Sequence, residues 1–238
     1  MEKIKDKKIV LVGASGSIGS FTAKLLAAGG ADIYITGHNA ERLERTAMEC
    51  GISAEKVFEL DITNEEQVQA VTDTILRQSG GIDVLIIASG IGIIKPIELL
   101  TTEDFLRSLA VNLTGPFLLI KAFLPMMKEK KKGLIINIPG ILGKTPMAGA
   151  VAYSASKYGL NGMMKSLREE LKRTEIRITQ LFLGGVDSNF WNEIDLRVQR
   201  DKMILAEEAA KAIWFLCQQP VSGVVSEMVI QPFNHQVI

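Results

Sequence analysis

Apolar and polar positions follow two different periods along the chain. Short runs of aliphatic and β-branched residues predict buried strands at 8–12, 32–36, 56–60, 84–87, 134–138, 177–182 and 224–230. Longer segments, in which apolar residues recur every three or four positions, predict helices at 17–28, 40–50, 65–79, 103–130, 150–173 and 206–218. Strand and helix therefore alternate along the whole chain.

The predicted strands are apolar on both faces, which is typical of a parallel sheet covered by helices on both sides. We therefore expect an α/β fold with seven parallel strands. Ligands of such sheets bind beyond the carboxyl ends of the strands. No linker, repeat or low-complexity segment interrupts the pattern, so we expect one domain over residues 1–238.

Composition narrows the class of protein. Lys plus Arg and Asp plus Glu both total 27, so we expect no general attraction to nucleic acid or to an anionic membrane. Cys50 and Cys217 are too few for a disulfide framework, and with only His38 and His235 we expect no metal site. The N-terminus carries no apolar signal region and no uncharged stretch reaches ~18 residues, so we expect a reduced, cytoplasmic protein.

A glycine-rich turn follows the first predicted strand and leads into a helix. At such a turn, free backbone amides and the positive helix end can meet a dinucleotide pyrophosphate. The alternative is a strand-to-helix turn that binds no ligand. The candidate cofactor-binding residues of this turn are Gly13, Ser15, Gly16, Ser17, Ile18 and Gly19.

Tyr153 and Lys157 stand four residues apart, a spacing that sets both side chains on one face of a helix. A tyrosine titrates near pH ~10, and a positive charge ~4 Å away stabilises the phenolate by about 4 kcal/mol at an effective dielectric of ~20. The pair thus predicts that Lys157 lowers the pKa of Tyr153 and makes it a proton donor at neutral pH. The alternative is a helix pair without chemistry.

With this turn, the Tyr-x-x-x-Lys helix and seven strands in order, the chain resembles the short-chain dehydrogenase/reductase family over essentially its whole length. The resemblance continues at Asp61 in Leu-Asp-Ile-Thr, at Asn112 in Val-Asn-Leu-Thr-Gly, and in the segment from Gly184. It implies a Rossmann-type, doubly wound sheet with helices on both faces. It also implies an NAD(P) cofactor and catalysis by Tyr153, Lys157 and Asn112.

The resemblance gives each catalytic residue a role. Tyr153 would protonate a carbonyl oxygen as hydride arrives, and oxidation would run the same steps backwards. Lys157 would lower the phenol pKa and bond the nicotinamide ribose, while the Asn112 backbone would hold a water that links Lys157 to solvent. From its residue type alone, Asn112 could instead cap or kink a long helix near Pro116.

Cofactor contacts are implied in the same way. Asp61 would bond the adenine ring beside Ile62, and the nicotinamide amide would be held by the Val186 backbone and the Ser188 hydroxyl, which replaces a usual threonine. The remaining implied contacts are Ala88, Ser89, Gly90 and Gly184, together with Tyr153 and Lys157.

The choice between NAD and NADP is read after the second strand. An acidic residue there would bond a ribose 2′-hydroxyl and repel a 2′-phosphate, but the chain reads Thr-Gly-His-Asn at positions 36–39. The absence of a carboxylate favours NADP over NAD, with His38 near the phosphate. The alternative is that His38 is an ordinary surface residue.

Gly140 stands thirteen residues before Tyr153, where the family usually has a serine that bonds the substrate oxygen. Losing one such donor typically costs on the order of 10² to 10³ in rate. A water, the Gly140 amide or a hydroxyl of the substrate could fill the gap. The segment 188–205, where the family places a lid, brings Phe190 and Trp191 as further substrate-binding candidates.

The expected function is therefore an NAD(P)-dependent oxidoreductase that interconverts a small secondary alcohol and a ketone. The alternative is a nucleotide-binding structural or regulatory subunit of the same fold with weak or no activity. Apolar residues surround much of the two helices that carry Asn112 and Tyr153, which favours burial of these helices against a partner subunit, and the resemblance implies a homodimer or homotetramer. These apolar residues include Leu118, Leu119, Phe123, Met163, Met164 and Leu167.

Overall fold

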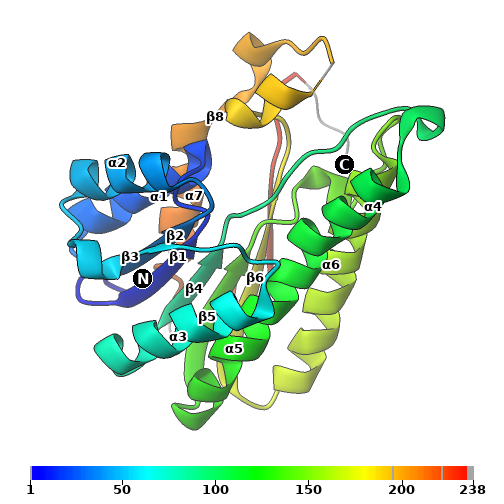
Figure 1. Cartoon of the computed structure of the whole chain (residues 1–238). Helices are drawn as coiled ribbons and strands as arrows, with labels where there is room; N and C mark the ends of the chain where they lie inside the picture. Colours follow the sequence, from blue (N-terminus) through cyan, green and yellow to red (C-terminus); the bar gives the residue numbers. More distant parts are fainter. Residues whose placement is uncertain (1, 195, 221, 235–238) are drawn as a thin grey trace.

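A parallel sheet of seven strands forms the centre of the computed structural model, which describes residues 2–194, 196–220 and 222–234 (Figure 1). The strands lie in the order β3-β2-β1-β4-β5-β6-β9. Their bounds are β1 Lys8–Val12, β2 Asp32–Gly37, β3 Val57–Glu59, β4 Val84–Ile87, β5 Lys132–Asn137, β6 Glu175–Leu183 and β9 Glu227–Ile230. A separate two-stranded ladder joins β7, Val186–Asp187, to β8, Ile204–Leu205. The doubly wound parallel fold predicted from the sequence is confirmed.

Helices connect the strands and cover both faces of the sheet (Figure 1). The α-helices are α1 Ser17–Ala28, α2 Ala40–Cys50, α3 Glu65–Ser79, α4 Thr102–Leu109, α5 Gly115–Glu129, α6 Val151–Leu171 and α7 Ala206–Leu216. A π-helical turn, η3, spans Ala110–Thr114. Short 3₁₀ turns are η1 Ala54–Lys56, η2 Ile97–Leu99, η4 Ile141–Gly143, η5 Asn189–Glu193 and η6 Arg200–Lys202.

The inner strands β1, β2, β4, β5 and β6 contribute to two hydrophobic cores, because successive side chains point to opposite faces. In β1, Ile9 and Leu11 join the core beneath α1, α2 and α7, whereas Val10 and Val12 join the core beneath α3, α5 and α6. This double burial is the physical reason that the strands read as unbroken apolar runs.

Local signals set both ends of α2 and of α3. The Asn39 side chain accepts a hydrogen bond from the backbone of Arg42 and begins α2, and Asn64 begins α3 in the same way. Gly51 and Gly80 end these helices with φ of 66° and 65°, a left-handed conformation that favours glycine. The predicted bounds of β1, β4, α1, α2 and α3 are accordingly confirmed.

The predicted helix 103–130 is confirmed as one continuous helical segment, Thr102–Glu129, but the π turn η3 inside it joins α4 to α5 and was not predicted. Pro116 has no N–H, so the carbonyl of Asn112, four residues earlier, cannot receive the usual helical bond. The chain instead closes a wider ring in which the Gly115 N–H donates to the Ala110 carbonyl. The predicted strands 56–60 and 224–230 are also shorter than expected, and β7 and β8 were not predicted.

The segment Thr102–Glu129 is long and apolar enough to cross a membrane by length and composition alone, with a mean hydropathy of 1.5. Its apolar residues nevertheless have a place inside the protein: Leu119, Phe123 and Met127 are fully buried in the core against the sheet. A core helix of a soluble protein passes the same test, so this segment is weak support for a membrane span.

Burial also corrects the residues that the sequence assigned to a partner subunit. Leu118, Leu119, Phe123 and Met164 are buried in the core of this chain, and Met163 and Leu167 pack against the same core. On these helices, Leu106, Phe117, Val151 and Tyr158 are the large hydrophobic residues that remain exposed among the described residues. The ends of the predicted domain, residues 1 and 235–238, lie outside the described residues, as does residue 195.

Candidate active site

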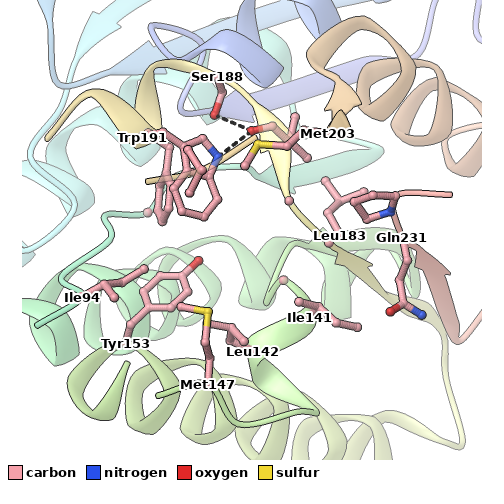
Figure 2. A pocket seen from close by; sticks show the side chains of 18 of the residues that line it. Ile94, Ile141, Leu142, Met147, Tyr153, Leu183, Ser188, Trp191, Met203 and Gln231 are labelled. Atoms are coloured by element: carbon pink, nitrogen blue, oxygen red, sulfur yellow. Dashed lines mark hydrogen bonds between the residues drawn. The ribbon is translucent and has the colours of Figure 1, made fainter. Parts of the chain in front are cut away.

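A cavity of about 630 Å³ opens at the carboxyl ends of β1, β4, β5 and β6. Here β1 and β4 lie side by side although two other strands separate them in the sequence, and ligands of doubly wound sheets bind at such switch points. Figure 2 shows Tyr153 and Met147 on one side of the cavity and Trp191 and Met203 on the other. The predicted residues that line it are Ile18, Ala88, Ser89, Gly90, Gly140, Tyr153, Lys157, Gly184, Val186, Ser188, Phe190 and Trp191.

The glycine-rich turn lies next to the cavity and needs its glycines for close backbone packing. Gly13 has a φ of 94°, and a Cβ there would lie 2.8 Å from the Ala88 backbone. A Cβ on Gly19 would lie 2.1 Å from the Gly13 carbonyl oxygen, so α1 can begin this close to β1 only with glycine. Apart from Ile18, the predicted residues of the turn do not line the cavity: Ser15 packs against Gly37, and the Ser17 hydroxyl accepts a hydrogen bond from the backbone of Asn189.

Tyr153 and Lys157 lie one turn apart on α6, and both face the cavity. The Lys157 ammonium nitrogen lies 5.5 Å from the centre of the Tyr153 ring. Ile94, Leu142 and Phe190 surround the Tyr153 ring with apolar atoms. The predicted juxtaposition of a phenol and an ammonium is therefore present.

The predicted lowering of the Tyr153 pKa is wrong for the protein without nucleotide. Burial raises the pKa of the Tyr153 phenol above its usual value. The reason is that a phenolate among apolar side chains loses its hydration, a cost that the sequence argument left out. Tyr153 therefore carries its proton at neutral pH.

Lys157 is a buried cation with few bonds inside the protein. Its side chain is 3% exposed, and its hydrogen bond within the described residues is a long one, 3.4 Å, to the Ile138 carbonyl. Burial lowers the pKa of Lys157 to about 8. A Cβ on Gly90 would lie 3.1 Å from the ammonium, so glycine at this position leaves the ammonium reachable from the cavity.

Asn112 lies in the π turn behind the cavity and is fully buried. Its side chain makes two hydrogen bonds to the backbone of Ile91: it accepts one from the Ile91 N–H at 2.9 Å and donates one to the Ile91 carbonyl at 2.9 Å. It also donates to the Ser156 hydroxyl, which belongs to α6. Asn112 therefore ties the loop after β4 to the helix that carries Tyr153, and its family role toward a water stays a prediction.

His38 and Asp61 lie together at the ends of β2 and β3, away from the cavity lining. The Thr63 hydroxyl and backbone N–H hold the pKa of Asp61 below its usual value, and the nearby His38 ring adds to this effect. Ile62 is buried and packs against Gly115. The predicted adenine and 2′-phosphate contacts at this corner stay predictions.

At the other side of the cavity, the Val186 carbonyl oxygen accepts two hydrogen bonds, from the Trp191 indole at 2.9 Å and from the Ser188 hydroxyl at 3.3 Å (Figure 2). A Cβ on Gly184 would lie 2.6 Å from Pro232, so glycine permits the close passage of the C-terminal segment. The expected nicotinamide-binding residues Gly184, Val186 and Ser188 thus share one wall.

The segment between β7 and β8 forms a cover over Tyr153 that we call the lid, residues 188–203, of which the structure describes all but residue 195 (Figure 1). The Phe190 ring lies 5.7 Å from the Tyr153 ring, and its tip touches Gly92, where a Cβ would lie 2.2 Å away. Arg200 fastens the base of the lid, donating to Asp187 at 2.6 Å, to Asn192 at 2.9 Å and to the Ser188 carbonyl at 2.9 Å.

Several lining residues were missed by the sequence argument, because they come from the end of β6 or from segments between the main elements that have no recognisable spacing. They share an apolar or amide character, and only their assembly at one cavity identifies them. They include Ile94, Ile141, Leu142, Met147, Leu183, Met203 and Gln231.

The residues at the cavity fit a nicotinamide dinucleotide. The Ser89 hydroxyl oxygen is buried without a hydrogen-bond partner among the described residues, although Ser89 lines the cavity. Buried polar groups are normally paired, so a ligand with donors and acceptors is expected beside Ser89 and Lys157. No group of three or more His, Cys, Asp or Glu side chains that could hold a metal ion is found in the described part of the chain.

Two relatives match all or nearly all of the chain. An uncharacterized oxidoreductase of Staphylococcus saprophyticus is 30% identical over 246 residues and is matched over 100% of both chains. Another, from Staphylococcus epidermidis, is 29% identical, covering 98% of this chain and 100% of its own.

Solved structures show the same fold with nucleotide bound. An alcohol dehydrogenase from the archaeon Thermococcus sibiricus, complexed with 5-hydroxy-NADP, is 25% identical with a TM-score of 0.87, covering 98% of this chain and 99% of its own. A metagenomic short-chain oxidoreductase in complex with NADP is 30% identical with a TM-score of 0.81, covering 96% and 99%.

The family model described as short chain dehydrogenase matches residues 7–199, which include the glycine-rich turn, Asn112, Tyr153 and Lys157. Together with the doubly wound sheet and the cavity at its switch point, this match makes the protein an oxidoreductase that belongs to the short-chain dehydrogenase/reductase family.

Proposed function

We propose that this protein interconverts a secondary alcohol and a ketone with NADP as the preferred cofactor. One observation carries the proposal: a protonated phenol and a buried, sparsely bonded ammonium face the same cavity at the switch point of the sheet. A structural subunit would have no use for a buried lysine, because burying its charge is costly. The two solved relatives described above bind NADP or a derivative of it.

A nicotinamide cofactor would supply or accept the hydride at this site. Tyr153 would donate its hydroxyl proton to the carbonyl oxygen in the reducing direction and take it back in oxidation. Lys157 would stabilise the phenolate left on Tyr153 and offer its remaining protons to ribose hydroxyls. Phe190 and Leu142 would exclude water from the phenol.

The preference for NADP rests on the corner after β2. No carboxylate follows β2 directly: exposed His38 stands there, and Asn39 begins α2, whose positive N-terminal end favours a phosphate. We expect a lower KM for NADPH than for NADH. His38→Asp should reverse this order, because a carboxylate bonds a ribose 2′-hydroxyl and repels a 2′-phosphate.

Two measurements test the proposal in sequence. Quenching of the intrinsic fluorescence by NADPH, with Trp191 in the cavity wall as a reporter, measures binding. Turnover of a panel of ketones and secondary alcohols, with Tyr153→Phe as control, measures catalysis. We expect the variant to bind NADPH and to lose at least about 10²-fold in kcat. Rates that are negligible and equal in both proteins would contradict the proposal.

The second candidate is a nucleotide-binding subunit without useful turnover. Gly140 favours it, because no side-chain donor stands where the family usually has a serine, and the raised pKa of Tyr153 points the same way. Under this alternative the protein would bind NADPH and turn over no member of the panel.

We also propose a homodimer or homotetramer and a cytoplasmic location. The exposed Leu106, Phe117, Val151 and Tyr158 on α4, α5 and α6 are candidates for contact with a second copy. The free thiols of Cys50 and Cys217 are consistent with a reducing compartment.

A further inference from the structure

Gly140 adopts a backbone conformation that is closed to other residues. Its φ is 71° and its ψ is 168°, a region that essentially only glycine occupies. The usual serine therefore cannot be restored at this position without moving the backbone between β5 and η4. The backbone conformation of this turn therefore requires a residue without a side chain.

This glycine leaves room directly beside the reacting phenol. A Cβ built on Gly140 meets two atoms within 4 Å, the Tyr153 hydroxyl oxygen and the Leu183 carbonyl oxygen, each at 3.7 Å. Both are ordinary van der Waals distances, and Gly140, Tyr153 and Leu183 all line the cavity. A substrate atom can therefore occupy the space between the phenol and the end of β6, which we call the Gly140 niche.

The chemistry of the niche selects a hydrogen-bond donor. The Leu183 carbonyl oxygen can only accept, so a second carbonyl or a halogen in the niche would face an acceptor. A substrate hydroxyl could donate to Leu183, while the Tyr153 hydroxyl donates to the carbonyl that is reduced. Two oxygens on neighbouring carbon atoms lie close enough together for both of these contacts to form at once.

The rest of the cavity favours an apolar body. Ile94, Leu142 and Met147 lie beside the phenol, and Trp191 lies across the cavity from it (Figure 2). Among the described lining residues the charged ones are Lys157, Arg197 and Lys202, and no carboxylate is among them to bind a substrate ammonium. The substituent opposite the hydroxyl is therefore expected to be aliphatic or aromatic.

We propose that the Gly140 niche selects ketones with a hydroxyl on the carbon next to the carbonyl and an apolar group on its other side. The inference rests on the proposed function. In reduction, hydride from the nicotinamide would reach the carbonyl carbon and the Tyr153 proton its oxygen, which yields a vicinal diol and the oxidised dinucleotide. The reverse reaction would oxidise the diol at the apolar end.

Three matched ketones test this selection with NADPH. Phenacyl alcohol carries the hydroxyl, propiophenone has a methyl group in its place, and phenacyl fluoride keeps the electron-withdrawing effect without a donor. We expect kcat/KM for phenacyl alcohol to exceed that of either partner by roughly tenfold or more, because a missing donor leaves the Leu183 oxygen unpaired.

Gly140→Ala should remove the niche, because either the added methyl group fills it or the turn shifts to relieve the strained backbone, and the preference should fall to about twofold or less. Gly51→Ala is a control for a methyl group added at a positive φ outside the cavity: Gly51 ends α2 in the left-handed conformation (φ 66°, ψ 29°), and an added Cβ there would have nothing within 4 Å. The control should keep the preference, and NADPH binding reports whether each variant is folded.

Equal kcat/KM for phenacyl alcohol and phenacyl fluoride in the unmodified protein would overturn the inference. So would a preference that survives in a folded Gly140→Ala variant. If the three compounds are inert while other ketones are reduced, the niche assignment fails and the proposed function stands. If NADPH binds and no ketone of any kind is reduced, both fail.

Discussion

Lys157 shows at the scale of one residue how function and stability conflict. Its ammonium is buried, makes a long hydrogen bond to Ile138, and has a pKa lowered to about 8 by that burial. The folded protein therefore bears the cost of a poorly solvated charge at neutral pH. Such a cost persists where a binding partner for the charge is expected, and the cavity supplies the place for one.

Replacing this lysine should make the protein without nucleotide more stable. Below pH 8 the lysine is charged in both states and weakens the fold. Between about 8 and 10.5 the folded protein loses its proton before the unfolded chain does, so stability rises with pH. We expect Lys157→Met to raise the free energy of unfolding at pH 7 by up to about 3 kcal/mol. Urea unfolding of both proteins at pH 7 and pH 9.5 measures the difference in their free energies of unfolding. If this difference is as large at pH 9.5 as at pH 7, the buried charge of Lys157 is not its cause.

The same ionisation should appear in catalysis. Lys157 is protonated below its pKa of about 8 and neutral above it. Reduction needs the protonated form, because a neutral amine cannot offset the phenolate that forms on Tyr153. We expect kcat/KM for ketone reduction to be constant below pH 7 and to fall above about pH 8. A profile that stays level to pH 10 would exclude this role for Lys157.

At the scale of elements, irregular backbone positions the site. Pro116 prevents a regular helix, and the resulting π turn sets Asn112 against the Ile91 backbone and α6. π turns are frequent at functional sites for this kind of reason. The lid is held by the contact of Phe190 with Gly92 and by the three hydrogen bonds of Arg200.

Gly92 offers a test of lid closure. A methyl group there would lie 2.2 Å from the tip of Phe190, so Gly92→Ala should push the lid away from Tyr153. We expect faster proteolytic cleavage within residues 188–203 and a KM for ketone raised several-fold, with little change in the unfolding midpoint. Gly223→Ala, where the added atom would meet Pro220 at an ordinary 3.5 Å, should behave like the unmodified protein. Unchanged cleavage in Gly92→Ala would show that Phe190 does not hold the lid.

At the scale of the whole molecule, α5 and α6 each have one side buried in the core and another side exposed to solvent. The inner sides of α5 and α6 are buried against the sheet, whereas Phe117 on α5 is 47% exposed and Tyr158 on α6 is 43% exposed. Exposed aromatic residues of this size are characteristic of protein interfaces. The core residues that the sequence assigned to a partner are thus replaced by a smaller exposed set.

Phe117→Glu should weaken assembly without unfolding the chain, because a charge on an exposed side chain costs little in the monomer but is unfavourable in an apolar interface. Light scattering after size exclusion should show a lower mass than for the unmodified protein, whereas Met48→Glu, an exposed position on α2, should not change it. A monomeric unmodified protein would refute the proposed assembly.

What the sequence determined by itself was local or periodic. Apolar runs gave the inner strands, because these strands are buried on both faces, and Asn39 and Gly51 marked helix ends through contacts within a few residues. The spacing of Tyr153 and Lys157 placed a phenol and an ammonium together for the same reason. These features depend on neighbours along the chain.

Tertiary structure decided what depends on segments that meet only after folding. The direction of the Tyr153 pKa follows from burial near Ile94, Leu142 and Phe190, which come from three different loops. The Gly140 niche exists because the end of β6 lies beside the turn after β5. Desolvation and cavity shape depend on the whole surroundings of an atom, and no spacing along the chain encodes them.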